Sequence, residues 1–276
     1  MLDPLSVALL ILGFPLGRTR VKRYTTQLSK FLVYVVAPVL GFWAGLEIGK
    51  LWIAALATLP ELAVFYLSRL TVEGCEKKGA IGITSAFGNT IFLGIPIVLS
   101  ISGNVDAAVV YAMATTFIHY TLADVHACKK GKIKFQPFTV TFLIGILISG
   151  YKSLFMKYVW TKTLAAEMSK LGLLVLGLSF ERQHLRLKKD VLRVGMFKHV
   201  LLPLLTLPFA LLMSEVSSMK SLISESSMPP AFMNIALAYV YGYDVDLVTA
   251  SVITLTLLWL VAFTLLYLFE FLFYHL

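Results

Sequence analysis

Charged side chains are scarce in this chain. Only 14% of its 276 residues are Asp, Glu, Lys or Arg, whereas 58% are hydrophobic and the mean hydropathy is +0.84. Soluble domains carry about 25% charged residues, and a soluble core could not bury so much apolar surface. A bilayer can, because each spanning helix needs roughly 20 apolar residues. The composition therefore argues against a soluble protein and predicts an all-α integral membrane protein.

Cysteine is nearly absent, with Cys75 and Cys128 the only two. Both lie beside lysine-rich breaks assigned below to the cytoplasm, where two reduced thiols are expected. Asp124, His126 and Cys128 alternate in one segment, but no further ligands lie nearby, so we predict a solvated loop and no metal. The N-terminus lacks a basic segment and a small-residue cleavage site, and we interpret its apolar run as a first span, not a signal peptide.

Catalytic motifs are missing as well. The sequence contains no HExxH, no GxSG-type serine motif and no pair of aspartates on facing spans. We therefore expect neither enzyme activity nor a cofactor. The net charge of +9 would suggest nucleic acid in a soluble protein. Here the cations occupy short breaks between apolar runs, which is typical of a topology signal and predicts the lipid bilayer as partner, not nucleic acid.

Ten apolar runs divide the chain and predict ten spans in a single domain, residues 1–276. They lie roughly at 4–17, 29–46, 51–69, 80–102, 107–123, 138–155, 165–180, 192–213, 220–242 and 246–270. Most of the 24 Lys and Arg residues occupy the breaks after odd-numbered runs, at 18–30, 69–78, 129–134 and 182–193. Because cytoplasmic loops are enriched in cations, these breaks are predicted to face the cytoplasm and both termini the outside of the plasma membrane.

Five spans in each half would place the halves upside down relative to one another. Residues 1–125 would form the first repeat and residues 136–276 the second, inverted one. A short echo supports this division, because the Thr-Leu-Pro sequence at 58–60 in run three recurs at 206–208 in run eight. Inverted repeats are a hallmark of secondary transporters.

Two runs contain breaks. Run four includes GNTIFLGIP at 88–96, and run nine includes SESSMPPAFMN at 224–234 with Pro229 next to Pro230. Adjacent prolines remove two backbone donors and clash with the preceding turn. Broken backbone at membrane depth is tolerated only inside protein or along a wet cavity. Breaks in the fourth span of each half point to a transporter's binding site, although prolines that merely kink each helix remain the alternative.

Polar groups surround both breaks. Each half-helix that follows a break directs free N–H groups and its positive dipole end toward the same point, which favours an anion such as a carboxylate. The predicted substrate-binding residues are Asn89, Thr90, Gly94, Pro96, Ser227, Met228, Pro229, Pro230 and Asn234.

Three titratable residues inside the runs are candidates for coupling transport to an ion. Glu61 lies in the middle of run three, and an intramembrane carboxylate is a functional hypothesis by default; a structural acid is the alternative. Glu225 lies close to the second break or at the mouth of a cavity. His119 could titrate near neutral pH, or serve as an interhelical hydrogen-bonded histidine. Glu167 and Lys170, one turn apart, are expected to pair.

The two broken motifs resemble those of the auxin efflux carrier family. The resemblance rests on GNTIFLGIP and on SMPPA followed by YVYGYDVDL, and LGLLVLGLSF and HVLLPLLTLPF extend it over nearly the whole chain. It is to the PIN-like prokaryotic and archaeal members, within the bile acid/arsenite/riboflavin transporter grouping. It implies ten transmembrane helices in two inverted five-helix repeats, with a scaffold domain and a transport domain. Helices four and nine would cross near Pro96 and Pro229 or Pro230.

The same resemblance implies a secondary transporter of auxins or small carboxylates, with Asn89 as the family's motif asparagine. Ile91 replaces the usual motif glycine and would narrow the site. The long central loop of large plant carriers is missing. We therefore predict an efflux-type carrier of a small organic anion that works by alternating access of the elevator type. A sodium-coupled symporter of the bile-acid type and a channel remain alternatives, and a homodimer is a further partner that the sequence leaves open.

Overall fold

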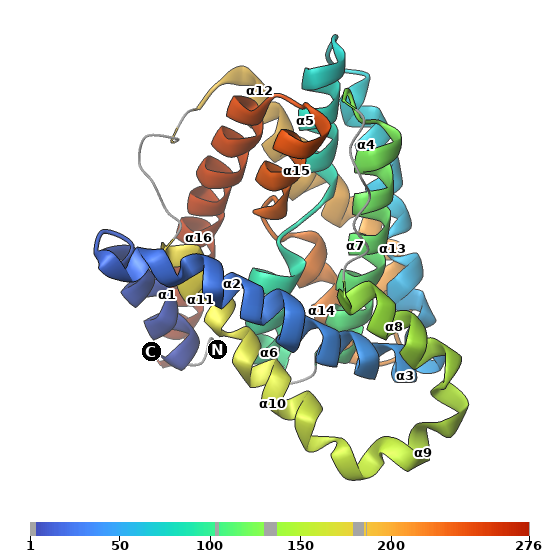
Figure 1. The fold of residues 1–276 in the computed structure, drawn as a ribbon. Coiled ribbons are helices and arrows are strands. Elements are labelled where there is room, and N and C mark those ends of the chain that lie inside the picture. Colours follow the sequence, from blue (N-terminus) through green and yellow to red (C-terminus); the bar gives the residue numbers. More distant parts are fainter. Residues whose placement is uncertain (1–3, 103–104, 130–136, 179–184, 186, 276) are drawn as a thin grey trace.

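The computed structural model describes residues 4–102, 105–129, 137–178, 185 and 187–275. Within these ranges the chain is almost entirely helical and contains no strand (Figure 1). The predicted all-α class is therefore confirmed, and it agrees with the rule that backbone in lipid must satisfy its own hydrogen bonds.

The elements follow one another without a long connection in either half. In the first half they are α1 (Pro4–Leu16), η1 (Arg20–Tyr24), α2 (Thr25–Phe31), η2 (Leu32–Val36), α3 (Ala37–Leu56), α4 (Leu59–Arg69), α5 (Cys75–Ala86), η3 (Thr90–Gly94), α6 (Ile95–Ser102) and α7 (Asp106–Val125). In the second half they are α8 (Pro137–Leu147), η4 (Ser149–Tyr151), α9 (Lys152–Phe155), η5 (Met156–Tyr158), α10 (Trp160–Ser169), α11 (Leu171–Leu178), α12 (Lys189–Met196), η7 (Phe197–Leu201), α13 (Leu202–Leu211), α14 (Val216–Ser226), α15 (Met233–Tyr241) and α16 (Val245–His275).

Few of these helices are long enough to cross a bilayer alone. Among the described residues, Lys189–Leu211 and Val245–Leu266 have the length and apolar composition of a span. Two bent pairs would raise the number to four, Leu32–Glu47 with Trp52–Arg69 and Thr139–Leu147 with Ser149–Tyr158. Each of the ten apolar runs has helical segments in its place, but the count of ten spans stays a prediction because most runs are divided into shorter helices.

The breaks after even-numbered runs meet at one end of the molecule. Lys162, between runs six and seven, forms an ion pair with Asp106, between runs four and five. Lys152 pairs with Glu47, which lies at the end of run two. This end is the lower one in Figure 1, where α9 and α10 lie.

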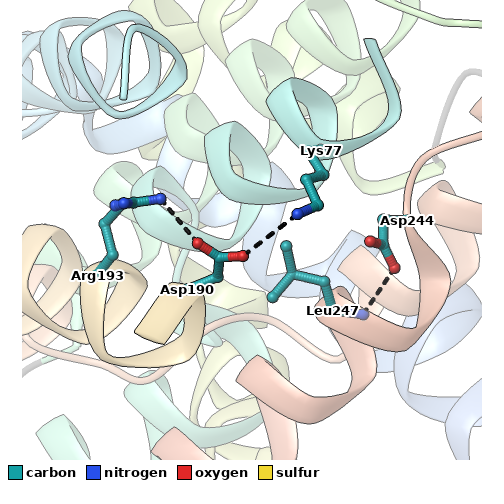
Figure 2. Close-up of polar contacts among 5 residues, drawn as sticks. All are labelled: Lys77, Asp190, Arg193, Asp244 and Leu247. Atoms are coloured by element: carbon teal, nitrogen blue, oxygen red, sulfur yellow. Dashed lines mark hydrogen bonds and ion pairs between the residues drawn. The ribbon is translucent and has the colours of Figure 1, made fainter. Parts of the chain in front are cut away.

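The breaks after runs three, five, seven and nine meet at the opposite end. The N–H of Asp244 donates to the carbonyl of Glu76 at 3.1 Å. Asp190 lies between Lys77 and Arg193, at 3.6 and 2.8 Å (Figure 2). The predicted alternation of the breaks between two ends is therefore present in the fold. The first cationic break is an exception, because Figure 1 places η1 beside the lower helices.

The two cysteines correct the sequence interpretation. Cys75 and Cys128 form a disulfide between the third and fifth breaks, with Cα atoms 5.8 Å apart, so the expected pair of reduced thiols is wrong. The N–H of Cys128 also donates to the carbonyl of Tyr241 at 2.9 Å, which holds the loop against the end of α15. His126 contacts the guanidinium of Arg69 at 3.3 Å, and no cluster of three metal-ligating side chains occurs among the described residues.

Facing glycines bring two helix pairs into backbone contact. In the α1–α11 pair, a Cβ added at Gly13 would lie 2.7 Å from the Cα of Gly177. In the α3–α8 pair, a Cβ added at Gly145 would lie 3.0 Å from the Cα of Gly45. Small residues at helix contacts are typical of membrane bundles, where van der Waals packing drives association.

The separation of the two ends predicts the outcome of cysteine labelling. In a Cys75→Ser/Cys128→Ser background, Ser214→Cys and Lys188→Cys place exposed thiols at the even and odd ends. From the cation rule we expect a membrane-impermeant maleimide to label Ser214→Cys on intact cells, and Lys188→Cys only after permeabilisation. Labelling of Lys188→Cys on intact cells would reverse the predicted orientation.

Candidate functional site

The structure interrupts two helices at the positions that the prolines and glycines predict. α5 ends at Ala86 and the next helical turn begins at Thr90. α14 ends at Ser226 and α15 begins at Met233. Each interruption leaves terminal carbonyl and N–H groups that a continuous helix would have paired.

The two interrupted segments cross and pair with one another. Gly88 and Pro230 form an isolated antiparallel bridge. The backbone bonds at the bridge run from Asn89 N–H to the Pro229 carbonyl at 2.7 Å and from Ala231 N–H to the Phe87 carbonyl at 3.0 Å. Each segment thus satisfies backbone groups of the other, which makes a broken helix tolerable inside a membrane protein.

A cavity lies beside this crossing. Its polar walls are Asn89 and Thr90 from the first break and Thr115, Thr116 and His119 from α7. The ring of His119 stacks on Phe87 with centroids 4.2 Å apart. Within the described part of the chain, the amide nitrogen of Asn89 and Nε2 of His119 are buried without a hydrogen-bond partner. An unpaired buried donor is costly, so these atoms are suited to a ligand in the cavity.

Most of the other predicted substrate-binding residues lie around the crossing and do not line the cavity. The hydroxyl of Ser227 donates to the Ile223 carbonyl at 2.8 Å within its own helix. The Asn234 amide donates to the carbonyls of Ile83 and Phe87 at 3.3 and 3.4 Å, where it caps the end of α5. The cavity lining likewise does not include Gly94, Pro96, Met228, Pro229 or Pro230.

A buried lysine at the crossing was not among the predicted site residues. Lys198 lies in η7, in the rod formed by α12, η7 and α13, and is 0% exposed. Its ammonium donates to the carbonyl of Ala86 at 3.0 Å, at the end of the interrupted α5. The signal was present in the sequence, because Lys198 is a cation inside an apolar run, and such residues mark functional sites.

Two of the predicted coupling residues accompany this lysine. Glu61, in the first turn of α4, and Glu225, in the last turn of α14, are each 0% exposed. Both carboxylates interact electrostatically with Lys198. Glu61 Oε1 accepts hydrogen bonds from Tyr111 at 2.9 Å and Thr115 at 3.0 Å. Thr115 also lines the cavity, so it connects the charged cluster to the candidate binding site.

The glycines of the GNTIFLGIP motif leave room for this charged cluster. A Cβ added at Gly88 would lie 2.9 Å from Nζ of Lys198, and one added at Gly94 would overlap the carboxylate of Glu225. These two glycines therefore admit the charged side chains to the crossing.

We expect Gly94→Ala to disturb the site because its methyl group overlaps the buried Glu225 carboxylate. Overpacking of this kind costs about 1–3 kcal/mol of stability, which a melting curve of the purified protein would show as a lower Tm. Gly49→Ala in α3 is the matched control, since no atom lies within 4 Å of its added Cβ. Equal Tm values for the two variants would contradict the tight fit at Gly94.

Comparison with known proteins places the chain among membrane transporters. The model of the membrane transport protein family matches residues 126–267, just over half of the chain, and this segment includes Lys198, Glu225 and the Pro229–Pro230 break. The chain belongs to this family, which is that of the auxin efflux carriers, and the resemblance of its motifs is confirmed. Members of the family are transporters, not enzymes. The search of curated proteins found no match.

Proposed function

We propose that the protein is a secondary carrier that moves a small organic anion, such as a carboxylate, across the plasma membrane by alternating access. The observation that carries the proposal is the unpaired amide of Asn89, which is buried beside the crossing and lines its cavity. An amide nitrogen donates hydrogen bonds and so suits a carboxylate oxygen.

The helix ends at the crossing favour the same charge. η3 begins at Thr90 and α15 begins at Met233, and both residues line the cavity. The first N–H groups of a helix have no partner within it and carry partial positive charge. Two such ends therefore complement a carboxylate. Ile91 also lines the cavity, and its side chain favours a narrow substrate over a bulky one.

Helix packing supports two inverted repeats, residues 1–125 and 136–276. The α1–α11 pair joins predicted spans one and seven, and the α3–α8 pair joins spans two and six. A pseudo-two-fold exchange of the halves converts one pair into the other, and both pairs meet through facing glycines. The contacts of α4 with α5 and of α13 with α14 are related in the same way. Ten spans with both termini outside complete this proposal.

We further propose an elevator movement in which the crossing travels against a scaffold. α1, α3, α8, α10 and α11 would form the scaffold, because α3 packs on α8 and α10, and α1 on α11. The crossing helices would move together with α4, α7, α12, α13 and α16. Glu61, Glu225 and His119 would then travel with the bound substrate, as coupling groups must.

Ligand binding tests the proposal directly. Purified protein would be melted in the presence of small carboxylates and indole carboxylates. A ligand at 100 times its Kd adds about 2.7 kcal/mol of stability, and we expect a concentration-dependent rise in Tm for at least one carboxylate but not for its amide. A rise with the neutral amide equal to that with the acid would contradict an anion site.

A further inference from the structure

We propose that the ammonium of Lys198 is a built-in counter-ion for Glu61 and Glu225, which takes the place of a bound sodium ion and makes the carrier independent of sodium. The three side chains come from separate elements, η7, α4 and α14, and converge at the helix crossing. The inference rests on the proposed carrier function for its consequence in transport, but the site itself can be tested without transport.

The carboxylates have the character of a cation site. Within the described part of the chain, Oε2 of Glu61 and both oxygens of Glu225 are buried without a hydrogen-bond partner. Buried charges are expected to be paired or to coordinate a metal, and carboxylate and carbonyl oxygens are ligands for hard cations. The Ala86 carbonyl at the end of α5 adds another oxygen. Without an internal cation, such a cluster would attract a small cation from solution.

Lys198 already supplies that cation. Its ammonium binds the Ala86 carbonyl and interacts with both carboxylates. A helix C-terminus such as that of α5 also favours positive charge. The space around the ammonium is preserved by Gly88, because a Cβ there would lie 2.9 Å from Nζ. A sodium ion placed between the same carboxylates would be repelled by a charge that cannot leave.

The remaining charge leaves a place for one proton. Two carboxylates and one ammonium sum to a single negative charge, and a proton on either carboxylate neutralises it. The other titratable groups that face the cluster are His119 and Tyr111 on α7 and His199 next to Lys198. The cluster would then exchange a proton instead of a sodium ion during transport.

The test compares the response to sodium of the full-length wild type and of Lys198→Met. Each purified protein would be melted in NaCl and in choline chloride at equal ionic strength. We expect the Tm of the wild type to be the same in both salts, and that of Lys198→Met to rise with sodium concentration by roughly 5 °C. Lys198→Arg, which keeps the charge, is the matched control and should ignore sodium. A sodium-dependent wild type, or a Lys198→Met variant that ignores sodium, would overturn the proposal.

A second variant covers the case in which Lys198→Met does not fold in either salt. Lys198→Met/Glu61→Gln/Glu225→Gln removes the carboxylates together with their counter-ion. If Lys198 serves to balance them, the triple variant should fold and show no response to sodium; failure of the triple variant to fold would refute the counter-ion role. Lack of carboxylate flux in any salt would instead count against the proposed function, with the sodium response of Lys198→Met left intact.

Discussion

Asn89→Ala is expected to lower the affinity for a carboxylate substrate by about 10- to 150-fold while the protein stays folded. The side-chain amide of Asn89 is unpaired and lines the cavity, so truncation removes a hydrogen bond to a charged ligand, a loss of about 1.5–3 kcal/mol. The crossing itself survives, because Asn89 pairs with Pro229 through its backbone N–H, and its carbonyl accepts from Leu93 and Gly94.

The matched control is Asn234→Ala. The Asn234 amide donates to the carbonyls of Ile83 and Phe87, so its loss leaves buried acceptors unpaired and should lower Tm more than it lowers affinity. Substrate Kd and Tm would be measured for both variants. Wild-type affinity in a well-folded Asn89→Ala protein would remove Asn89 from the binding site.

Glu61→Gln is expected to abolish accumulation driven by a pH gradient while it spares exchange of substrate across the membrane. The glutamine keeps the shape of the side chain and can still accept the hydrogen bonds from Tyr111 and Thr115. It cannot load or release a proton. Lys198 would remain paired with Glu225, so the cluster would stay neutral through the whole transport cycle. The final ratio of inside to outside substrate should therefore approach roughly one, as for passive equilibration of a carrier.

Proteoliposomes with an imposed pH gradient provide the measurement for this variant. Glu225→Gln serves as the comparison, and we expect it to alter affinity more than coupling, because the Glu225 carboxylate lies against Gly94 next to the first break. Two results would defeat the role of Glu61: unchanged pH dependence in Glu61→Gln, or a wild-type protein that ignores the pH gradient. Glu61 would then be a structural acid held by Tyr111 and Thr115.

Features with a local chemical cause were predictable from the sequence. Adjacent prolines cannot continue a helix, and the chain is interrupted around Pro229 and Pro230. Glu167 and Lys170 lie one turn apart and form the expected ion pair at 2.6 Å. The apolar runs likewise predicted where helices form, because hydrophobicity over a whole segment is a strong signal.

Features that depend on contacts between distant segments were not predictable. Nothing near Lys198 in the sequence shows that it reaches Ala86, 112 positions away, nor that Gly88 leaves it room. The Cys75–Cys128 disulfide likewise needed the third and fifth breaks at one end of the molecule. Gly94 was correctly placed at the crossing, but the side chain that it accommodates, Glu225, comes from the other half of the chain.

Counterflow in proteoliposomes tests the proposed carrier function most directly. Vesicles containing the purified protein would be loaded with a small unlabelled carboxylate and diluted into a trace of the labelled compound. We expect transient accumulation of label that saturates with concentration, that is lost in Asn89→Ala, and that is the same in sodium and choline buffers. A flux that rises linearly with concentration and shows no counterflow would identify a channel and contradict the proposed carrier.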